Sequence, residues 1–293
     1  MEVRQIATSY TGPVAATGAF ASTVATWDLT TKARLATFES VLDFGGRRLA
    51  VDEAGARCAT AGYVTGGLVC SSAATGSVTW TRADLRRLQF VGFSCDGRRL
   101  FCGADERPCL VLDAATGHQL EVLRGVRRVW ESFFTDAMLL DGARLKLTAR
   151  AGRSIAPIER TSFGVLDATF GPELLCISES GGPVRCVDVA GREVWRYGPA
   201  PGRHVLKVAY TGEMGCFVGV EWPYEHGGTK VLRRFSATGG EPRTVAELGK
   251  PAEVAFFAAG TRLLTSEGHV WDTINGIRVG RLVFDGAVSV DDV

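Results

Sequence analysis

The sequence predicts an all-β fold, a seven-bladed β-propeller built from four-stranded antiparallel blades. Short hydrophobic stretches separated by glycine turns recur along all 293 residues. Each unit has a turn of the D/S-x-x-x-G type between its third and fourth stretch, with clear copies ending at positions 32 (Lys in place of Gly), 76, 117, 191 (one residue shorter) and 276 and weaker ones at 152 and 239. These positions lie about 41 residues apart, the length of one propeller blade.

The period divides the chain into consecutive units with no linker between them. We therefore expect a single propeller domain over residues 1–293, with blades at about 1–39, 40–84, 85–124, 125–159, 160–200, 201–249 and 250–284 and a C-terminal extension at 285–293. The first and last units each supply four strands. The ring then closes either by side-chain packing or by addition of the segment 286–290 to a sheet edge.

The third unit illustrates how strands are predicted. Its inner strand is expected at 88–95, followed by an Asp-Gly turn, and the other strands at 99–103, 109–113 and 118–123. The runs are continuously apolar because both faces of an inner strand are covered by neighbouring blades. Residues 117–134 also have an apolar spacing typical of a helix, but the repeat favours strands there.

Composition argues against several classes of protein. The chain has no apolar run after an N-terminal basic cluster and no stretch of 18 apolar residues, which predicts a cytoplasmic protein. Its eight cysteines form no C-x-x-C motif and fall in predicted strands, as expected of reduced, buried thiols. We expect no metal and no cofactor.

Two of the turns resemble the WD-repeat family, at Trp27-Asp28 and Trp271-Asp272. The Gly-His dipeptide of that family is missing throughout, so the resemblance is to a degenerate WD-repeat-like propeller. The segments 72–80, 113–120 and 188–195 are more similar to the docking motifs of quinoprotein-like propellers. That likeness implies that a Trp or Leu on the outer strand packs against the next blade.

Catalytic signatures are absent from the sequence, which contains no G-x-S-x-G, H-E-x-x-H or phosphate-loop motif. The four histidines lie in different blades without metal-ligand spacing. Quinone-dependent activity, which the second resemblance would imply, also requires adjacent cysteines that this chain lacks. The sequence therefore predicts a protein that is not an enzyme.

Arginine is concentrated where one blade passes to the next. Those connections emerge on one face of a propeller, around the mouth of the central channel. Each is expected to carry a cation, so that a basic ring attracts an acidic peptide, phosphate or nucleic acid. Among these cations, the predicted partner-binding residues are Arg47, Arg48, Arg86, Arg87, Arg127, Arg128, Arg160 and Arg203. Chance placement of abundant arginines in solvated loops is the competing interpretation.

A long loop is predicted in the sixth unit at 221–228, opening on the same face. Its Trp222, Tyr224 and His226 are residue types that anchor protein interfaces. Alternatively, Trp222 folds back and caps its own blade.

These features favour a non-catalytic protein–protein interaction module, a subunit or adaptor of a larger assembly that binds an acidic protein partner on its loop face. One alternative is an enzyme or small-ligand binder using the central channel, which requires that Glu131, Asp167, Lys207 and Glu253 converge at one level; we expect them to be scattered. Another is contact with nucleic acid through the arginine ring, although the loops lack the interleaved aromatic residues that base stacking needs.

Overall fold

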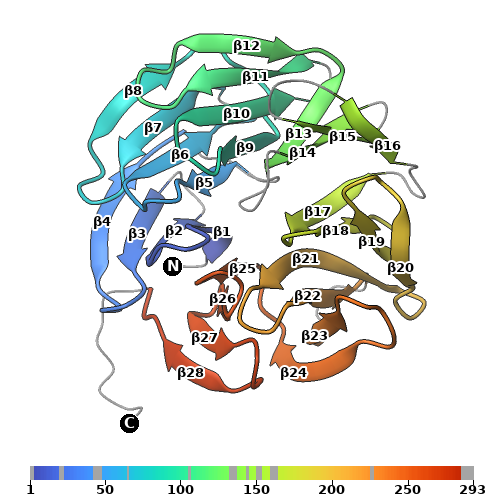
Figure 1. The fold of residues 1–293 in the computed structure, drawn as a ribbon. Coiled ribbons are helices and arrows are strands. Elements are labelled where there is room, and N and C mark those ends of the chain that lie inside the picture. Colours follow the sequence, from blue (N-terminus) through green and yellow to red (C-terminus); the bar gives the residue numbers. More distant parts are fainter. Residues whose placement is uncertain are drawn as a thin grey trace.

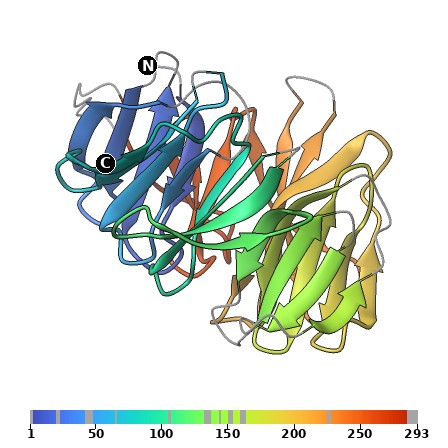
Figure 2. The same cartoon turned by 90° about the horizontal axis from the view of Figure 1, so that it is seen from above.

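The structure is a computed structural model, and it describes residues 3–19, 23–41, 48–64, 66–104, 107–131, 137–142, 145–149, 154–158, 164–224 and 228–284. Within them, every regular element is a β-strand, and the strands form an all-β propeller of four-stranded antiparallel blades (Figure 1). The sheets are arranged around a central axis. Turned by 90°, the molecule shows its strands running between the two faces of the ring (Figure 2).

Each sheet takes four consecutive strands, and neighbours in the sequence pair with each other. The strands of the first four sheets are β1 (Val3–Thr8), β2 (Val14–Ala19), β3 (Thr23–Asp28), β4 (Arg34–Glu39); β5 (Leu49–Val51), β6 (Arg57–Ala61), β7 (Leu68–Ser72), β8 (Val78–Arg82); β9 (Phe90–Phe93), β10 (Arg99–Ala104), β11 (Arg107–Asp113), β12 (Gln119–Leu123); and β13 (Val126–Glu131), β14 (Ala137–Gly142), β15 (Leu145–Ala149), β16 (Ser154–Ile158). The other sheets contain β17 (Val165–Phe170), β18 (Leu174–Glu179), β19 (Val184–Asp188), β20 (Glu193–Tyr197); β21 (Arg203–Thr211), β22 (Cys216–Pro223), β23 (Lys230–Ser236), β24 (Arg243–Gly249); and β25 (Val254–Phe257), β26 (Arg262–Thr265), β27 (His269–Asp272), β28 (Arg278–Arg281).

The D/S-x-x-x-G turns connect the third and fourth strands of the blades. In the turn after β11, the Asp113 carboxylate accepts hydrogen bonds from the backbone N–H groups of Ala115 (3.0 Å) and Thr116 (2.8 Å). The turn then needs a residue with positive φ, which Gly117 supplies at 73°. Asp28, Asp188 and Asp272 accept equivalent bonds, so the spacing in the sequence reflects a local hydrogen-bonding requirement.

Tryptophans of the outer strands pack against the turn of the next blade. Trp195 of β20 donates its indole N–H to the carbonyl of Ala237 (3.1 Å), and Trp80 of β8 donates to Ala114 (3.0 Å). A Cβ added to Gly239 would lie only 2.9 Å from the Cβ of Trp195. The close approach therefore requires glycine at the turn, and the packing that the docking-motif resemblance implied is present at both tryptophans.

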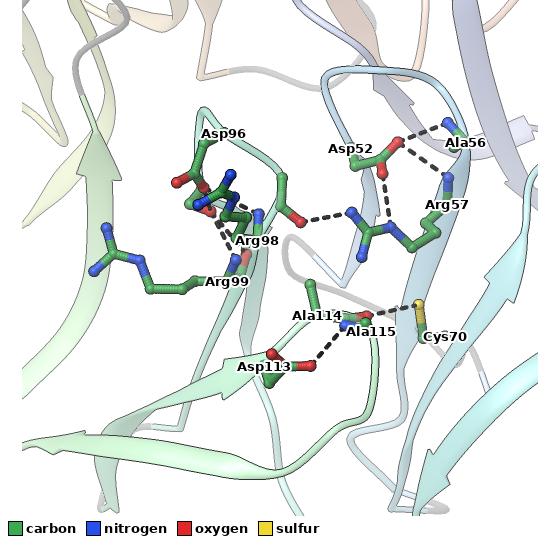
Figure 3. Close-up of polar contacts among 12 residues, drawn as sticks. Asp52, Ala56, Arg57, Cys70, Asp96, Arg98, Arg99, Asp113, Ala114 and Ala115 are labelled. Carbon is green, nitrogen blue, oxygen red and sulfur yellow. Dashed lines mark hydrogen bonds and ion pairs between the residues drawn. The ribbon is translucent and has the colours of Figure 1, made fainter.

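Polar contacts also join neighbouring blades on the side of these turns. Arg57 of β6 donates to the nearly buried Asp52 carboxylate (2.8 Å) in its own blade and to the carbonyl of Gly97 (2.6 Å) in the next (Figure 3). Because an arginine presents several donors in a fixed fork, one side chain can bond to both blades.

The first and last sheets meet through side chains. Trp27 of β3 packs its ring on Phe284, with centroids 5.4 Å apart, and Val3 and Ile6 belong to the same buried cluster as Leu264. In the part of the chain that is described, each of these two sheets contains four strands from its own sequence unit and none from the other. The segment 286–290, considered as a possible added strand, lies outside the described residues.

Candidate interaction face and central channel

The connections that run from the fourth strand of one blade to the first strand of the next all emerge on one face of the ring. The connections between second and third strands share that face, because successive antiparallel strands reverse direction. We call it the loop face. Its described connections include 83–89, 124–125, 198–202, 250–253 and the described residues between β22 and β23.

Only some of the predicted arginines are exposed there. Arg86 and Arg87 project from the 83–89 connection and are both exposed. Arg87 has a φ of 56°, an unusual value for a residue with a side chain. Arg47, Arg160 and His226 lie outside the described residues, and for Arg127 only the backbone, in β13, is described.

Three other predicted arginines bond within the protein. Arg48 is only 5% exposed, and its guanidinium lies 4.7 Å from the centre of the Tyr63 ring. Arg128 donates to the carbonyl of Val165 in the next blade (2.8 Å). Arg203 forms an ion pair with Glu221 at 2.5 Å. These three contribute to the structure of the loop face, whereas Arg86 and Arg87 contribute to its surface charge.

The predicted blade-six loop is shorter than the sequence suggested. Glu221, Trp222 and Pro223 continue strand β22 instead of forming a loop, because β22 pairs along its length with an unusually long inner strand, β21. Trp222 is half-buried, and the ammonium nitrogen of Lys230 lies 3.4 Å from the centre of its ring. The prediction that Trp222 stands in an exposed loop is therefore wrong.

Tyr224 does stand at the surface. Its side chain is 49% exposed, and its ring lies 4.5 Å from that of His204. Its backbone N–H donates to the carbonyl of Gly202 (2.7 Å), which ties it to the preceding blade connection. Partial burial lowers the pKa of His204, which favours a neutral imidazole beside the tyrosine.

A buried carboxylate that sequence analysis did not identify lies below this surface. Glu221 is fully buried and is bonded by Arg203, by Arg233 Nε (3.0 Å) and by the Tyr197 hydroxyl (3.0 Å). In the preceding blade, Glu179 at the corresponding position of β18 forms a second buried pair with Arg185 of the neighbouring strand β19. A buried carboxylate needs such partners, and they come from three different strands, so spacing in the sequence does not reveal them.

Lys230 is a further buried charge near the loop face. Only 4% of it is exposed, and its ammonium group donates to the carbonyl of Pro251. Burial lowers the pKa of Lys230 to about 8, although Glu253 and Glu267 act in the opposite direction. A lysine in this setting is only partly protonated near pH 8.

The inner strands surround a central cavity of about 320 Å³. Its lining includes Phe93 and the edges of Phe90, Phe170 and Phe256, which are largely buried in the core clusters between blades, and polar groups come from Gln5, Asp167, Lys207 and Glu253. Three of the four residues expected to be scattered, Asp167, Lys207 and Glu253, thus line one cavity, and that expectation is wrong for them. The side chain of the fourth, Glu131, is not described.

A repeated irregularity of the inner strands explains this convergence. The pairing of first and second strands shifts by one residue just before Gln5, Arg128, Asp167 and Lys207. Such β-bulges redirect the side chain that follows. Because the bulge occurs at the same place in four blades, it brings polar residues to one level, near the end of the channel at which the inner strands enter.

Among the described residues, no group of three or more His, Cys, Asp or Glu side chains is arranged to hold a metal ion. The same part of the chain contains no helix with the length and hydropathy needed to cross a membrane.

Comparison with known proteins supports the fold alone. No protein-family model matches the sequence, and no curated protein matches it. Among solved structures, the chain is similar to the crystal structure of BamB from Moraxella catarrhalis, with a TM-score of 0.57 and 13% sequence identity. The similarity covers 93% of this chain and 83% of that one. At this identity it extends to the propeller architecture and no further.

Proposed function

We propose that this protein is a non-catalytic, cytoplasmic protein–protein interaction module that serves as a subunit or adaptor of a larger assembly. We further infer that its seven sheets act as one degenerate WD-repeat-like, seven-bladed ring with quinoprotein-like docking between blades. An acidic protein partner binds its loop face. Contact with nucleic acid is the alternative on the same face.

The observation that carries the proposal is the surface around Tyr224. Exposed aromatic side chains that are already held in place bind partners well, because little conformational freedom is lost on binding. Tyr224 meets this requirement through its hydrogen bond to Gly202 and its contact with His204. The buried Glu221 and its arginines lie below and hold the strand that presents it.

A second patch lies across the ring. Val64, which is 79% exposed, stands on the loop-face connection between β6 and β7, near Arg86 and Arg87. The backbone N–H of Gly67 donates to the carbonyl of Leu85 (2.6 Å), so these two connections are held together. The second and sixth sheets lie on opposite sides of the ring (Figure 1), so a partner that contacts both patches must span the channel mouth.

Two surface variants test the proposal after native co-purification has identified the partner. Tyr224→Ala removes the aromatic anchor and should weaken binding about thirtyfold or more, since an anchor contributes at least about 2 kcal/mol. Arg86→Glu with Arg87→Glu should slow association and reduce its dependence on ionic strength.

The matched control is Arg98→Glu with Arg192→Glu, two exposed arginines in turns of the opposite face. This variant should bind as the parent does. Equal affinities for all three folded variants would place the interface elsewhere and refute the proposal. Competition by an RNA oligonucleotide, but not by an acidic peptide, would favour the nucleic-acid alternative.

A further inference from the structure

The junction between the seventh and the first blade, here called the closing junction, is built differently at its rim from other junctions of the ring. At three other junctions an aromatic side chain of an outer strand packs on a turn glycine of the next blade. The pairs are Phe38 with Gly76, Trp80 with Gly117 and Trp195 with Gly239. A Cβ added at any of these glycines would lie between 2.6 and 2.9 Å from the aromatic side chain. The close packing of ring and turn at these three rims therefore requires glycine.

At the closing junction this arrangement is reversed. Gly280 of β28 stands four residues after its turn glycine, as Trp195 of β20 does, but it has no side chain to pack on the next blade. The turn of the first blade has Lys32 in the glycine position, with a φ of 61°. A Cβ added at Gly280 would lie 3.0 Å from Lys32 Nζ. An exposed lysine side chain thus lies where an aromatic ring packs elsewhere, and it buries less apolar surface there.

Inside this rim, the closing junction has an apolar core. Trp27 and Phe284 pack edge to face, with ring centroids 5.4 Å apart, and both belong to a buried cluster that is drawn from the first and the seventh blade. The contact that is missing is therefore confined to the outer part of the junction.

A turn of the first blade supplies a different contact, near the axis of the ring. This turn, residues 9–13, connects β1 to β2 on the face opposite the loop face, and we call it the closing turn. Its Tyr10 lines the central cavity, and the Tyr10 hydroxyl donates to the carbonyl of Tyr210 in the sixth blade (2.6 Å). The Tyr10 carbonyl accepts the backbone N–H of Ala259 in the seventh blade (2.6 Å). Tyr10 thus bonds to the neighbouring blade and also to the blade beyond it.

The second blade holds the closing turn from the other side. The Glu53 carboxylate accepts the backbone N–H groups of Tyr10 (3.1 Å) and Thr11 (2.6 Å). Burial raises the pKa of the Tyr10 phenol, so its hydroxyl stays protonated and remains a donor to Tyr210. The closing turn therefore joins the first blade to the second, the seventh and the sixth.

The turn of the seventh blade is strained where it meets the closing turn. Ala258 and Ala259 have φ values of 47° and 50°, which residues with a side chain rarely adopt. A Cβ added at Gly260 would overlap the carbonyl oxygen of Tyr210, which is the acceptor of the Tyr10 hydrogen bond. Backbone strain of this kind persists only where the surroundings enforce it. The contact among these three blades therefore determines the shape of the turn.

We propose that the ring is closed near its axis, by the closing turn, and that the rim of the closing junction is where the ring opens first. The bonds of Tyr10 take the place of the docked aromatic rings of the three junctions described above. The Tyr224 surface is not involved, so failure of this inference would leave the proposed function unaffected.

Native-state hydrogen exchange, measured by mass spectrometry, locates the first opening. In the parent, amides of β28 should exchange faster than those of β20, whose Trp195 is docked. Tyr10→Phe removes one hydrogen bond and should accelerate exchange about fivefold, in the first and seventh sheets only. Tyr197→Phe is the matched control, because it removes a hydroxyl hydrogen bond between the fifth and sixth blades and should leave β28 unchanged. Equal acceleration by Tyr10→Phe in every sheet, or none in the seventh, overturns the proposal.

A second experiment restores the docking contact. Gly280→Trp combined with Lys32→Gly gives the closing junction the residue pair of the other three. Amides of β28 should then exchange about tenfold more slowly than in the parent, since a packed aromatic ring contributes more than one ordinary hydrogen bond. Lys32→Gly alone is the control and should not slow exchange to this extent. A folded double variant that exchanges like the parent places the first opening elsewhere and overturns the proposal; if the double variant does not fold, the comparison of Tyr10→Phe with Tyr197→Phe decides alone.

Discussion

Replacing Trp195 tests how the blades are held together. Its side chain is 9% exposed, its ring is stacked on Phe235 with centroids 5.8 Å apart, and its indole N–H is bonded to Ala237. Trp195→Ala should lower the free energy of unfolding by about 3–5 kcal/mol, as removal of a large buried side chain does. Trp195→Phe keeps most of the packing and loses the hydrogen bond, so it should cost about 1 kcal/mol.

The glycine under the ring allows a sharper test. Gly239 has a φ of 89°, and an added methyl group would meet Trp195 at 2.9 Å. Gly239→Ala should therefore cost about 1–2 kcal/mol for the left-handed backbone and more for the steric clash. In a Trp195→Gly background, which also removes the Cβ at 2.9 Å, the clash disappears and only the backbone cost of Gly239→Ala remains, so these two substitutions should be less than additive.

Urea unfolding followed by circular dichroism measures these differences, provided that the transitions are two-state. Additive effects of Trp195→Gly and Gly239→Ala would refute the idea that the close approach of the two residues fixes the blade junction. A cost for Trp195→Phe as large as that for Trp195→Ala would instead assign the junction to the hydrogen bond.

Three further predictions concern single residues. Ala259 adopts a φ of 50° in the turn after β25, so Ala259→Gly should raise the urea midpoint, with a gain of up to about 1 kcal/mol; a lower midpoint would contradict this. Lys230 has a native pKa of about 8 against an ordinary 10.5, so between these pH values the unfolded chain binds one more proton than the folded protein. The free energy of unfolding of the parent relative to Lys230→Met should therefore rise with pH through that window. A difference between the two proteins that does not change with pH would argue against the lowered pKa. Seven of the eight cysteines are buried, and burial raises the pKa of thiols such as Cys58 and Cys176. Because Cys95 is the one that is partly exposed, a thiol reagent should modify it first in the native protein. Rapid modification of several thiols would indicate a looser fold.

The features that sequence analysis predicted correctly are those with short-range causes. The turn at 113–117 needs an oxygen acceptor at its start and a residue with positive φ at its end, and both needs are visible as Asp113 and Gly117. In the third unit the predicted strands 99–103 and 118–123 differ from the observed bounds by one residue at one end each. The antiparallel, four-stranded repeat follows from such local requirements.

The features that sequence analysis missed depend on contacts between strands. Arg48 resembled any loop arginine, yet it is buried against Tyr63, which the next hairpin supplies. Pro223 and the following glycines predict a loop around Trp222, but pairing with β21 extends the strand through Pro223. Pairing of this kind can override the local preference of a segment.

The bulge position in the inner strands shows how a repeated fold joins its blades through polar side chains. Arg128 at this position bonds to Val165 in the next blade, and Asp167 bonds to Val208 in the blade after that. Lys207 continues the series toward Glu253, but across 3.8 Å. Short bonds at the first two positions identify residues that join blades, so substituting them would mainly reduce stability. The third pair lines the central cavity where the sixth and seventh blades meet. The same inner-strand position therefore supplies a polar contact to the next blade in three successive blades.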